Sequence, residues 1–254
     1  MTKTILIEGK ISVDAVLRSK YRKVLTIFYD IAKLQRKKNI KRELPLKQTL
    51  ELGNSKEVPI KAVDHEWFEK NAIGKTHGGI AAIVSERTYQ KITELLKSKP
   101  CIYFFLDGIE DPYNLGYTIR SLYAAGIDGI IMKKRSWYNM EGIIIKSSAG
   151  TSELMPMAFV EDLENTANFF KSKNYTIACT NKDEGESIYQ STLKPPLFIV
   201  IGGEKRGITS NFLDKADIQL SIPYKRKFSE SLPLNSVAVI IGFEILRQQI
   251  YSNK

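Results

Sequence analysis

The sequence predicts an α/β protein: a mostly parallel sheet in the longer C-terminal part, with a smaller α/β unit before it. After residue 100, short apolar runs such as Phe198–Ile201 alternate with helical patterns. This alternation is typical of a parallel sheet covered by helices on both faces. A polar break lies near Lys97–Pro100, and the whole excess of positive charge precedes it. These observations predict two domains, residues 1–97 and residues 98–254.

The first part reads as a small α/β unit. Its expected strands are Ile5–Ile7, Leu25–Tyr29, Val58–Ala62 and Gly79–Val84. Its expected helices are Val13–Ser19, Ile31–Lys38 and His65–Asn71. A further amphipathic helix leads to the break, because apolar residues recur there at helical spacing between Tyr89 and Leu96.

The second part shows the alternation more clearly. Its expected strands are Ile102–Leu106, Gly129–Met132, Met157–Phe159, Thr176–Thr180, Leu197–Ile201 and Ile218–Ile222. Its expected helices are Asn114–Ala125, Met140–Ser148, Leu163–Lys173, Ser210–Lys215 and Val237–Tyr251. Asp111 can cap the first of these helices, and Pro112 suits its first position, where a missing N–H costs nothing.

The charge is unevenly placed along the chain. Residues 1–100 hold 21 Lys and Arg against 11 Asp and Glu, whereas residues 101–254 hold 17 of each, so the net charge of +10 lies in the first part. A basic domain joined to a neutral one indicates that the first binds a polyanion such as nucleic acid. The alternative is a solvated surface that keeps the protein soluble.

The composition argues against membrane-spanning, secreted and metal-binding proteins. The sequence is 43% hydrophobic and 26% charged, as in ordinary globular proteins. No apolar run approaches the roughly 20 residues that cross a bilayer, and no signal peptide is evident, so a cytoplasmic protein without a membrane partner is expected. Cys101 and Cys179 are expected to be buried thiols. Two cysteines and two histidines far apart predict no metal site.

Three loops are expected at the carboxyl ends of the strands, where a parallel sheet binds its ligands: Asp107–Asn114, Gly202–Gly207 and Pro223–Asn235. The second loop has the spacing of a phosphate-binding P-loop, but Ile208 stands where the lysine is required, which argues against an NTPase. No G-x-G occurs among the glycines, which argues against an ordinary NAD site and disfavours the glycine-rich methyltransferase fold.

Four segments, taken together, resemble a known family. LDGIEDPYNLGYTIRSLYAAG, LFIVIGGEKRGIT and LSIPYKRKFSESLPLNSVAVIIGFEILRQ, in this order, are similar to the three motifs of the SpoU/TrmH family of the SPOUT class of RNA methyltransferases. KSSAGTSELMPM is a further match. The N-terminal part is similar to the family's ribosomal-protein-like RNA-binding domain, so the resemblance covers essentially the whole chain.

The resemblance implies a catalytic domain with a deep trefoil knot, S-adenosylmethionine as cofactor, and a homodimer. The positions that match the family's cofactor-binding residues are Thr180, Ile201, Gly202, Gly203, Ile222, Pro223 and Leu232. The positions that match its catalytic residues are Asn114, Arg120, Glu204, Ser231 and Asn235.

These residue types suit methyl transfer to a ribose 2′-hydroxyl. That hydroxyl is a weak nucleophile, so its oxygen must be aligned with the methyl group and its proton must be removed during the reaction. Arginine stays protonated in proteins, so Arg120 is expected to stabilise the developing alkoxide or to bind the adjacent phosphate, while Asn114 orients the hydroxyl. Glu204 could hold the arginine. In isolation, Arg120 also reads as a surface arginine, and Glu204 as a loop carboxylate paired with Lys205 or Arg206.

The third motif departs from the family pattern. The family usually reads S-L-N-V-S before the last helix, whereas this chain reads SLPLNS from Ser231 to Ser236. Either Pro233 replaces the asparagine, or Asn235 supplies it after a local insertion. Pro233 lacks an N–H and restricts Leu232 to extended geometry, so backbone contacts here can differ from the family's.

The sequence therefore predicts an S-adenosylmethionine-dependent RNA 2′-O-ribose methyltransferase, with ribosomal RNA favoured over transfer RNA as its substrate. Two alternatives stay open: a non-catalytic RNA-binding or ribosome-assembly protein with a decayed donor pocket, and a methyltransferase that modifies a base.

Overall fold

The computed structural model describes residues 3–35, 40–72, 74, 77–137, 140–203 and 207–251, with the backbone alone for residues 34–35 and 40–43. These residues form two compact units. The first comprises Met1–Thr88 with Trp137–Leu154, and the second comprises Tyr89–Ser136 with Met155–Lys254. Residues 137–154 thus group with the first unit, although they follow the second unit's early strands in the chain. The boundary at residue 97 stays a prediction.

The first unit is built on a four-stranded sheet of order β1-β4-β2-β3. Strand β2 is antiparallel to β4 and parallel to β3, and β1 is antiparallel to β4. The four strands are β1 (Thr4–Glu8), β2 (Val24–Asp30), β3 (Ile60–Val63) and β4 (Ile80–Ser85). All four expected strands are therefore present, with shifted ends.

The first unit also contains helices. Their bounds are α1 (Lys10–Arg18), α2 (Ile31–Gln35), α3 (Ile40–Ser55), α4 (His65–Asn71), α7 (Glu141–Ser147) and a short 3-10 helix, η2 (Thr151–Glu153). Among them, α1, α3 and α7 contact its sheet. Apolar residues of α1 pack with those of the strands in one core, and Ile145 of α7 joins this core. Asp64 caps α4 by accepting a hydrogen bond from the N–H of Trp67. Helix α3 was not expected from the sequence.

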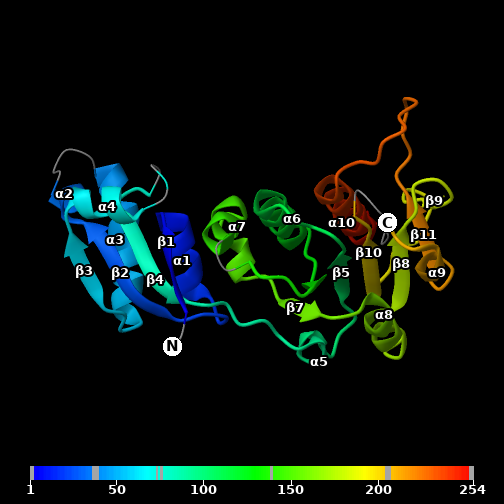
Figure 1. The fold of residues 1–254 in the computed structure, drawn as a ribbon, viewed down its shortest axis with the longest axis horizontal. Coiled ribbons are helices and arrows are strands. Elements are labelled where there is room, and N and C mark those ends of the chain that lie inside the picture. Colours follow the sequence, from blue (N-terminus) through cyan, green and yellow to red (C-terminus); the bar gives the residue numbers. More distant parts are fainter. Residues whose placement is uncertain are drawn as a thin grey trace. The chain divides into compact units, whose positions relative to one another are not determined.

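The second unit contains a seven-stranded sheet of order β7-β6-β5-β10-β8-β11-β9, and the neighbouring strands in it run parallel (Figure 1). This confirms the expected parallel sheet. The strands are β5 (Ile102–Leu106), β6 (Gly129–Lys133), β7 (Met157–Val160), β8 (Thr176–Thr180), β9 (Glu186–Ser187), β10 (Leu197–Ile201) and β11 (Ile218–Ser221). Strands β5 and β10 are buried along their whole length.

Both faces of this sheet carry helices (Figure 1). These are α5 (Ile92–Leu95), α6 (Pro112–Ala124), α8 (Leu163–Lys171), α9 (Ser210–Leu213) and α10 (Leu234–Tyr251). Phe170 of α8 stacks on Phe198 of β10 with ring centroids 4.3 Å apart. On the other face α6 and α10 lie side by side; Gly242 allows this approach, because a Cβ there would lie 2.9 Å from the Leu122 side chain.

The order of the strands brings the three expected loops together. Strand β10 lies between β5 and β8, and β11 lies beside β8. The carboxyl ends of parallel strands meet at one edge of a sheet. The segments that follow β5, β8, β10 and β11 therefore meet at a common edge. Cys179 of β8 and Cys101, which directly precedes β5, are buried and free, as expected.

Candidate active site

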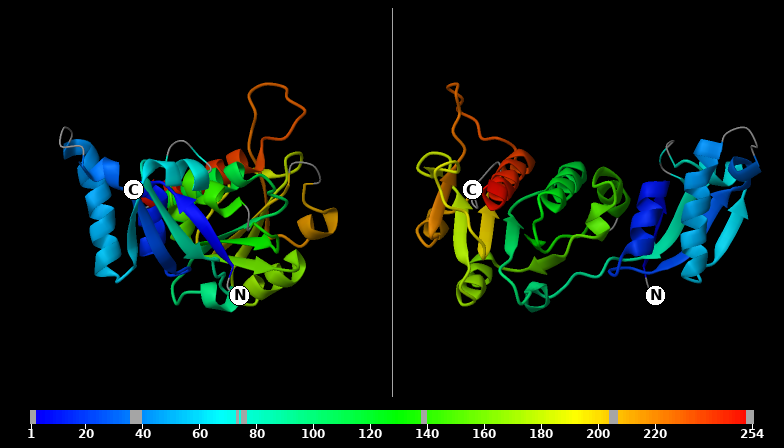
Figure 2. Two further views of the ribbon diagram at one scale, coloured as in Figure 1. Left: turned by 60° about the vertical axis from the view of Figure 1, so that its left-hand side comes forward. Right: turned by 180° about the vertical axis from the view of Figure 1, so that it is seen from behind.

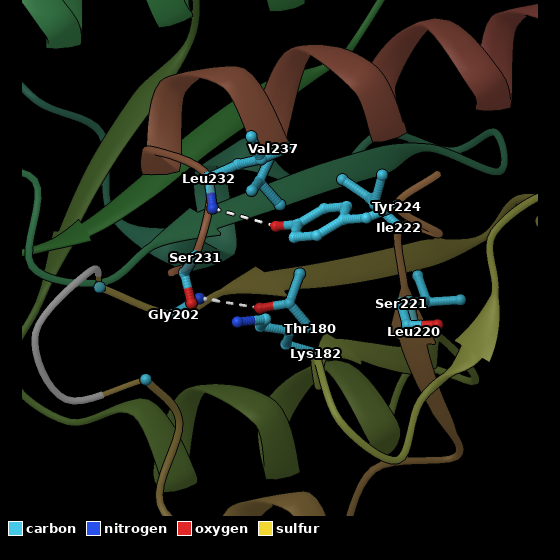
Figure 3. Close-up of a pocket in the computed structure, with 12 residues that line it drawn as sticks. Thr180, Lys182, Gly202, Leu220, Ser221, Ile222, Tyr224, Ser231, Leu232 and Val237 are labelled. Atoms are coloured by element: carbon cyan, nitrogen blue, oxygen red, sulfur yellow. Dashed lines mark hydrogen bonds between the residues drawn. The ribbon is translucent and has the colours of Figure 1, made fainter. Parts of the chain in front are cut away.

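The first cavity lies at the carboxyl ends of β8, β10 and β11 (Figure 3). Backbone and apolar side chains form much of its wall. It is lined by Thr180, Lys182, Gly202, Gly203, Gly207, Leu220, Ser221, Ile222, Tyr224, Ser231, Leu232 and Val237. Five of the seven expected cofactor-binding residues line it: Thr180, Gly202, Gly203, Ile222 and Leu232. Ile201 is buried in β10, and neither it nor Pro223 is among the lining residues.

The wall of this cavity depends on close backbone approach at two glycines. The N–H of Gly202 donates to Thr180 Oγ1 at 3.2 Å, which joins the ends of β10 and β8. A Cβ on Gly202 would lie 2.8 Å from the Ile208 side chain and 2.9 Å from the Gly207 carbonyl carbon. A Cβ on Gly203 would lie 3.1 Å from the carbonyl oxygen of Asp107. Contacts under 3.0 Å force a shift, so Gly202 is sterically required here.

We expect Gly202→Ala to weaken binding of S-adenosylmethionine at least about tenfold, a loss of roughly 1.4 kcal/mol. The added methyl group displaces backbone that lines the cavity. Isothermal titration calorimetry measures this change. Gly142→Ala is the matched control, because a Cβ there meets nothing within 4 Å. Unchanged affinity in Gly202→Ala would show that the ligand does not use this wall.

The loop between β11 and α10 closes the cavity through two contacts that the sequence did not reveal. The hydroxyl oxygen of Tyr224 accepts a hydrogen bond from the N–H of Leu232 at 3.1 Å (Figure 3). Lys182 Nζ donates to the carbonyl oxygen of Ser229. Lys182 follows β8 by two residues, so its position near the carboxyl end of a parallel strand, where such sheets bind their ligands, is the signal that could have revealed it.

A second cavity, of about 560 Å³, adjoins the first and shares Gly203 and Gly207 with it. Its remaining lining residues are Asp107, Gly108, Ile109, Glu110, Asp111, Asn114, Lys133, Leu234 and Asn235. The acidic turn after β5 therefore forms one of its walls. Lys133 lies 3.1 Å from the Asp107 carboxylate.

Two asparagines meet in the second cavity. Asp111 caps α6, accepting a hydrogen bond from the N–H of Asn114 at 2.7 Å, and so fixes Asn114 in the first turn of the helix. Asn235 lies in the first turn of α10, and its Nδ2 donates to Asn114 Oδ1 at 3.4 Å. The geometry therefore favours the alternative in which Asn235 supplies the family's asparagine after a local insertion. Pro233 lies in the loop just before α10.

The other expected catalytic residues lie elsewhere. Ser231 lines the first cavity and is exposed. Arg120 is exposed on α6 and is not among the lining residues of either cavity. Glu204 lies outside the described residues. Within one chain, the structure thus brings Asn114 and Asn235 together and leaves Arg120 apart from them.

Comparison with known sequences decides the family. The sequence model of the SpoU rRNA Methylase family matches residues 101–243, more than half of the chain. The model described as RNA 2'-O ribose methyltransferase substrate binding matches residues 6–90. The chain belongs to the SpoU rRNA methylase family. This confirms the resemblance drawn from the motifs and the expectation of an S-adenosylmethionine-dependent RNA 2′-O-ribose methyltransferase.

Individual relatives agree with this assignment. The 23S rRNA (guanosine-2'-O-)-methyltransferase RlmB of Yersinia pestis is 29% identical over 96% of this chain and 97% of its own. Among solved structures, the SpoU methyltransferase AviRb from Streptomyces viridochromogenes in complex with AdoMet aligns with a TM-score of 0.78 and 19% identity, covering 98% of this chain and 91% of that one. An AdoMet-bound rRNA methyltransferase from Sinorhizobium meliloti aligns with a TM-score of 0.74 and 20% identity, over 96% and 87%.

Proposed function

We propose that this SpoU family member transfers a methyl group from S-adenosylmethionine to a ribose 2′-hydroxyl of ribosomal RNA. The observation that carries this is the pair of adjoining cavities, one walled by glycine backbone and one holding two asparagines in contact. Ribosomal RNA is favoured over transfer RNA because relatives similar over nearly the whole chain, such as the Yersinia pestis one, are named for 23S rRNA.

The residues of the first cavity fit the donor. Gly202 and Gly203 present backbone to the cavity, and apolar side chains such as Leu232 lie opposite polar groups such as Thr180 (Figure 3). A mixed apolar and polar wall with exposed backbone is typical of small-molecule sites. When bound, S-adenosylmethionine supplies a methyl group attached to a positively charged sulfonium sulfur. The leaving group is the neutral thioether that keeps this sulfur.

The residues of the second cavity orient the acceptor. The Asn114 amide is held by the helix start and by Asn235, and we assign it the hydrogen bond that orients the 2′-hydroxyl. Holding the oxygen in line with the methyl group removes much of the entropic barrier to the reaction. Ser231 lines the first cavity, and we assign its hydroxyl a polar contact with the donor or the acceptor.

We expect Asn235→Ala to lower the rate of methyl transfer roughly 10- to 100-fold, because Asn114 loses the partner that orients it. Donor affinity should stay within about twofold, since Asn235 does not line the first cavity. Single-turnover kinetics with labelled donor measure the first quantity and calorimetry the second. Asn168→Ala, an exposed asparagine on α8, is the control. Full activity in Asn235→Ala would remove this residue from the site.

A homodimer would explain the exposed face shared by α6 and α10. Tyr113, Tyr117 and Tyr123 of α6 are 52%, 49% and 41% exposed. Phe243 and Tyr251 of α10 are 44% and 57% exposed. Aromatic residues gathered on two adjacent helices are typical of a protein interface. A second copy of this chain, packed helix against helix, would bury them.

The dimer would also give Arg120 a role. Arg120 follows Tyr117 by three residues, so both lie on one face of α6. An arginine on the interface of one subunit can enter the second cavity of the other. There its guanidinium would stabilise the developing alkoxide or bind the neighbouring phosphate. Glu204, on the loop after β10, is proposed to hold it.

The finer features of the fold are part of the proposal. A deep trefoil knot is supported by the strand order, since β10 inserts between β5 and β8 and the chain then crosses to β11 before α10 returns to α6. Residues 1–97 are proposed to capture RNA, supported by their charge and by the substrate-binding match. A cytoplasmic location is supported by the two free, buried cysteines. No described helix is both long and apolar enough to span a bilayer.

The choice of RNA is tested by incubating the protein with methyl-labelled donor and with purified ribosomal or transfer RNA. The proposal expects label in ribosomal RNA, recovered after digestion as a 2′-O-methylated nucleoside. Label confined to transfer RNA would overturn the choice of substrate. Label on a base would overturn the assignment of the reacting hydroxyl.

A further inference from the structure

The segment that connects β11 to α10 is a long loop, residues 222–233, that extends beyond the edge of the second unit's sheet (Figures 1 and 2). Two contacts hold its base. Tyr224 accepts the hydrogen bond from the N–H of Leu232, which brings the two ends of the loop together. Lys182 crosses from the segment after β8 to the carbonyl oxygen of Ser229. The loop is therefore anchored at the donor cavity.

The tip of this loop carries three consecutive cations and an aromatic ring. Lys225, Arg226 and Lys227 are all exposed, and within the described part of the chain none of them forms an ion pair. Phe228 follows them and is 53% exposed, with its ring centroid 6.0 Å from that of Tyr224. The tip thus combines three cations that form no ion pair with an accessible aromatic face. Glu230 is the loop's one acidic residue, so the loop keeps a net positive charge.

This combination matches the chemistry of single-stranded nucleic acid. Phosphates of the backbone are bound by lysine and arginine, and unpaired bases stack on aromatic side chains. Three adjacent like charges repel one another when they have no counter-charge, so an anionic ligand is favoured at the tip. An acidic protein would satisfy the cations but would give Phe228 no base to stack on.

We propose that Lys225, Arg226, Lys227 and Phe228 bind an unpaired stretch of the RNA substrate beside the nucleotide that is methylated. Phe228 stacks on a neighbouring base, and the three cations bind the phosphates around it. The proposal rests on the proposed function for the identity of the substrate. It adds a separate RNA-binding element on the catalytic unit, outside the basic N-terminal domain and outside both cavities.

The base of the loop is fixed at the donor cavity and its tip is not, and this difference predicts which kinetic parameter changes when the tip is altered. None of the four tip residues lines either cavity, whereas Tyr224 and Lys182 at the base line the donor cavity. Phe228 is next to Tyr224, so donor affinity is measured for each tip variant as well. Removing the tip side chains should therefore weaken RNA binding and raise KM. Donor affinity, and kcat at saturating RNA, should stay close to their original values. A merely structural role of the tip would instead lower stability or donor affinity.

The test compares the binding of three variants with that of the parent, using a short single-stranded oligoribonucleotide. The triple variant Lys225→Gln, Arg226→Gln, Lys227→Gln should lower single-strand affinity about tenfold or more at low salt. It should also reduce the slope of log affinity against log salt by roughly 2, because each phosphate that the protein neutralises on a single strand accounts for about 0.7 of that slope. Phe228→Ala should lower single-strand affinity about tenfold, and Phe228→Trp should restore it.

The matched control is the triple variant Lys99→Gln, Lys173→Gln, Lys194→Gln, which removes the same charge from exposed positions elsewhere on the second unit. It should leave single-strand affinity within about twofold. Equal losses in both triple variants would overturn the proposal, because they would report net charge alone. It would also be overturned if Phe228→Ala bound single strands as well as the parent, or if a poly-glutamate peptide competed as well as RNA.

Failure of this inference and failure of the proposed function give different results. Oligonucleotide binding needs no methyl transfer, so it decides the role of the tip even for an inactive protein. If the parent methylates RNA and both tip variants do so with unchanged KM, the tip proposal fails and the enzymatic proposal stands. If the parent transfers no methyl group, the enzymatic proposal fails whatever the tip variants bind.

Discussion

Arg120→Ala is expected to lower the rate of methyl transfer about 100- to 1000-fold, the usual cost of removing one preorganised donor to a developing oxyanion. Donor affinity should change little, because Arg120 does not line the donor cavity of its own chain. Arg120→Lys should recover only part of the activity, since lysine keeps the charge but lacks the planar fork of donors. Single-turnover rates and calorimetry measure the two quantities.

Mixing of subunits tests whether Arg120 acts across a dimer. Arg120→Ala and Asn114→Ala should each be inactive alone. If each site takes Asn114 from one chain and Arg120 from the other, a mixed dimer keeps one intact site, and random mixing should restore roughly a quarter of the parental activity. If both residues act within one chain, no mixture recovers activity. The absence of recovery in proven mixed dimers would contradict the proposed placement of Arg120.

Arg22→Met is expected to destabilise the first unit by about 3 to 5 kcal/mol, as when a buried ion pair loses one partner. Arg22 is buried and donates to Glu153 and Glu141 at 2.9 Å each. Burial lowers the pKa of Arg22, but the charges of Glu153 and Glu141 outweigh it and raise that pKa above its ordinary value. The guanidinium therefore stays charged. Its loss leaves the buried Glu141 carboxylate without the Arg22 cation and leaves Glu153 with Arg87, 3.9 Å away, as its cation.

Tryptophan fluorescence reports this unit selectively, because the chain's two tryptophans, Trp67 and Trp137, both belong to it. Denaturant unfolding followed by this signal gives the change in free energy. Arg18→Met is the control, since Arg18 is an exposed arginine at the end of α1. A loss in Arg22→Met no larger than that in Arg18→Met would show that the buried ion pairs do not hold residues 137–154 in this unit.

The parallel sheet was predictable because its strands are buried on both faces and so appear as continuous apolar runs, such as Phe198–Ile201. Helix α6 was predictable from its cap at Asp111 and from Pro112. Helix α3 was not expected, because Pro45 lies inside it and its apolar residues show little helical periodicity. Strand β9 has only two residues, too few to produce a pattern.

Strand ends and motifs sufficed to predict that Thr180, Gly202 and Leu232 lie together, and the structure places all three around one cavity; their binding of the donor stays a prediction. The sequence alone could not distinguish the two alternatives for the third motif, replacement of the asparagine by Pro233 or its supply by Asn235. An insertion in a loop changes the spacing of residues without changing their type. The hydrogen bond between Asn235 and Asn114 depends on α10 packing against α6, two segments far apart in the chain. The role of Arg120 stays a prediction, because in the proposed site Arg120 comes from a second chain and the sequence of one chain does not place it.

The most direct measurement maps ribose methylation across RNA from cells that lack the protein, before and after incubation with it and S-adenosylmethionine. We expect one new 2′-O-methyl group in ribosomal RNA, present with the parent protein and absent with Arg120→Ala. A new methyl group on a base, or no new methyl group from a protein that binds the donor and RNA, would contradict transfer to a ribose hydroxyl at these two cavities.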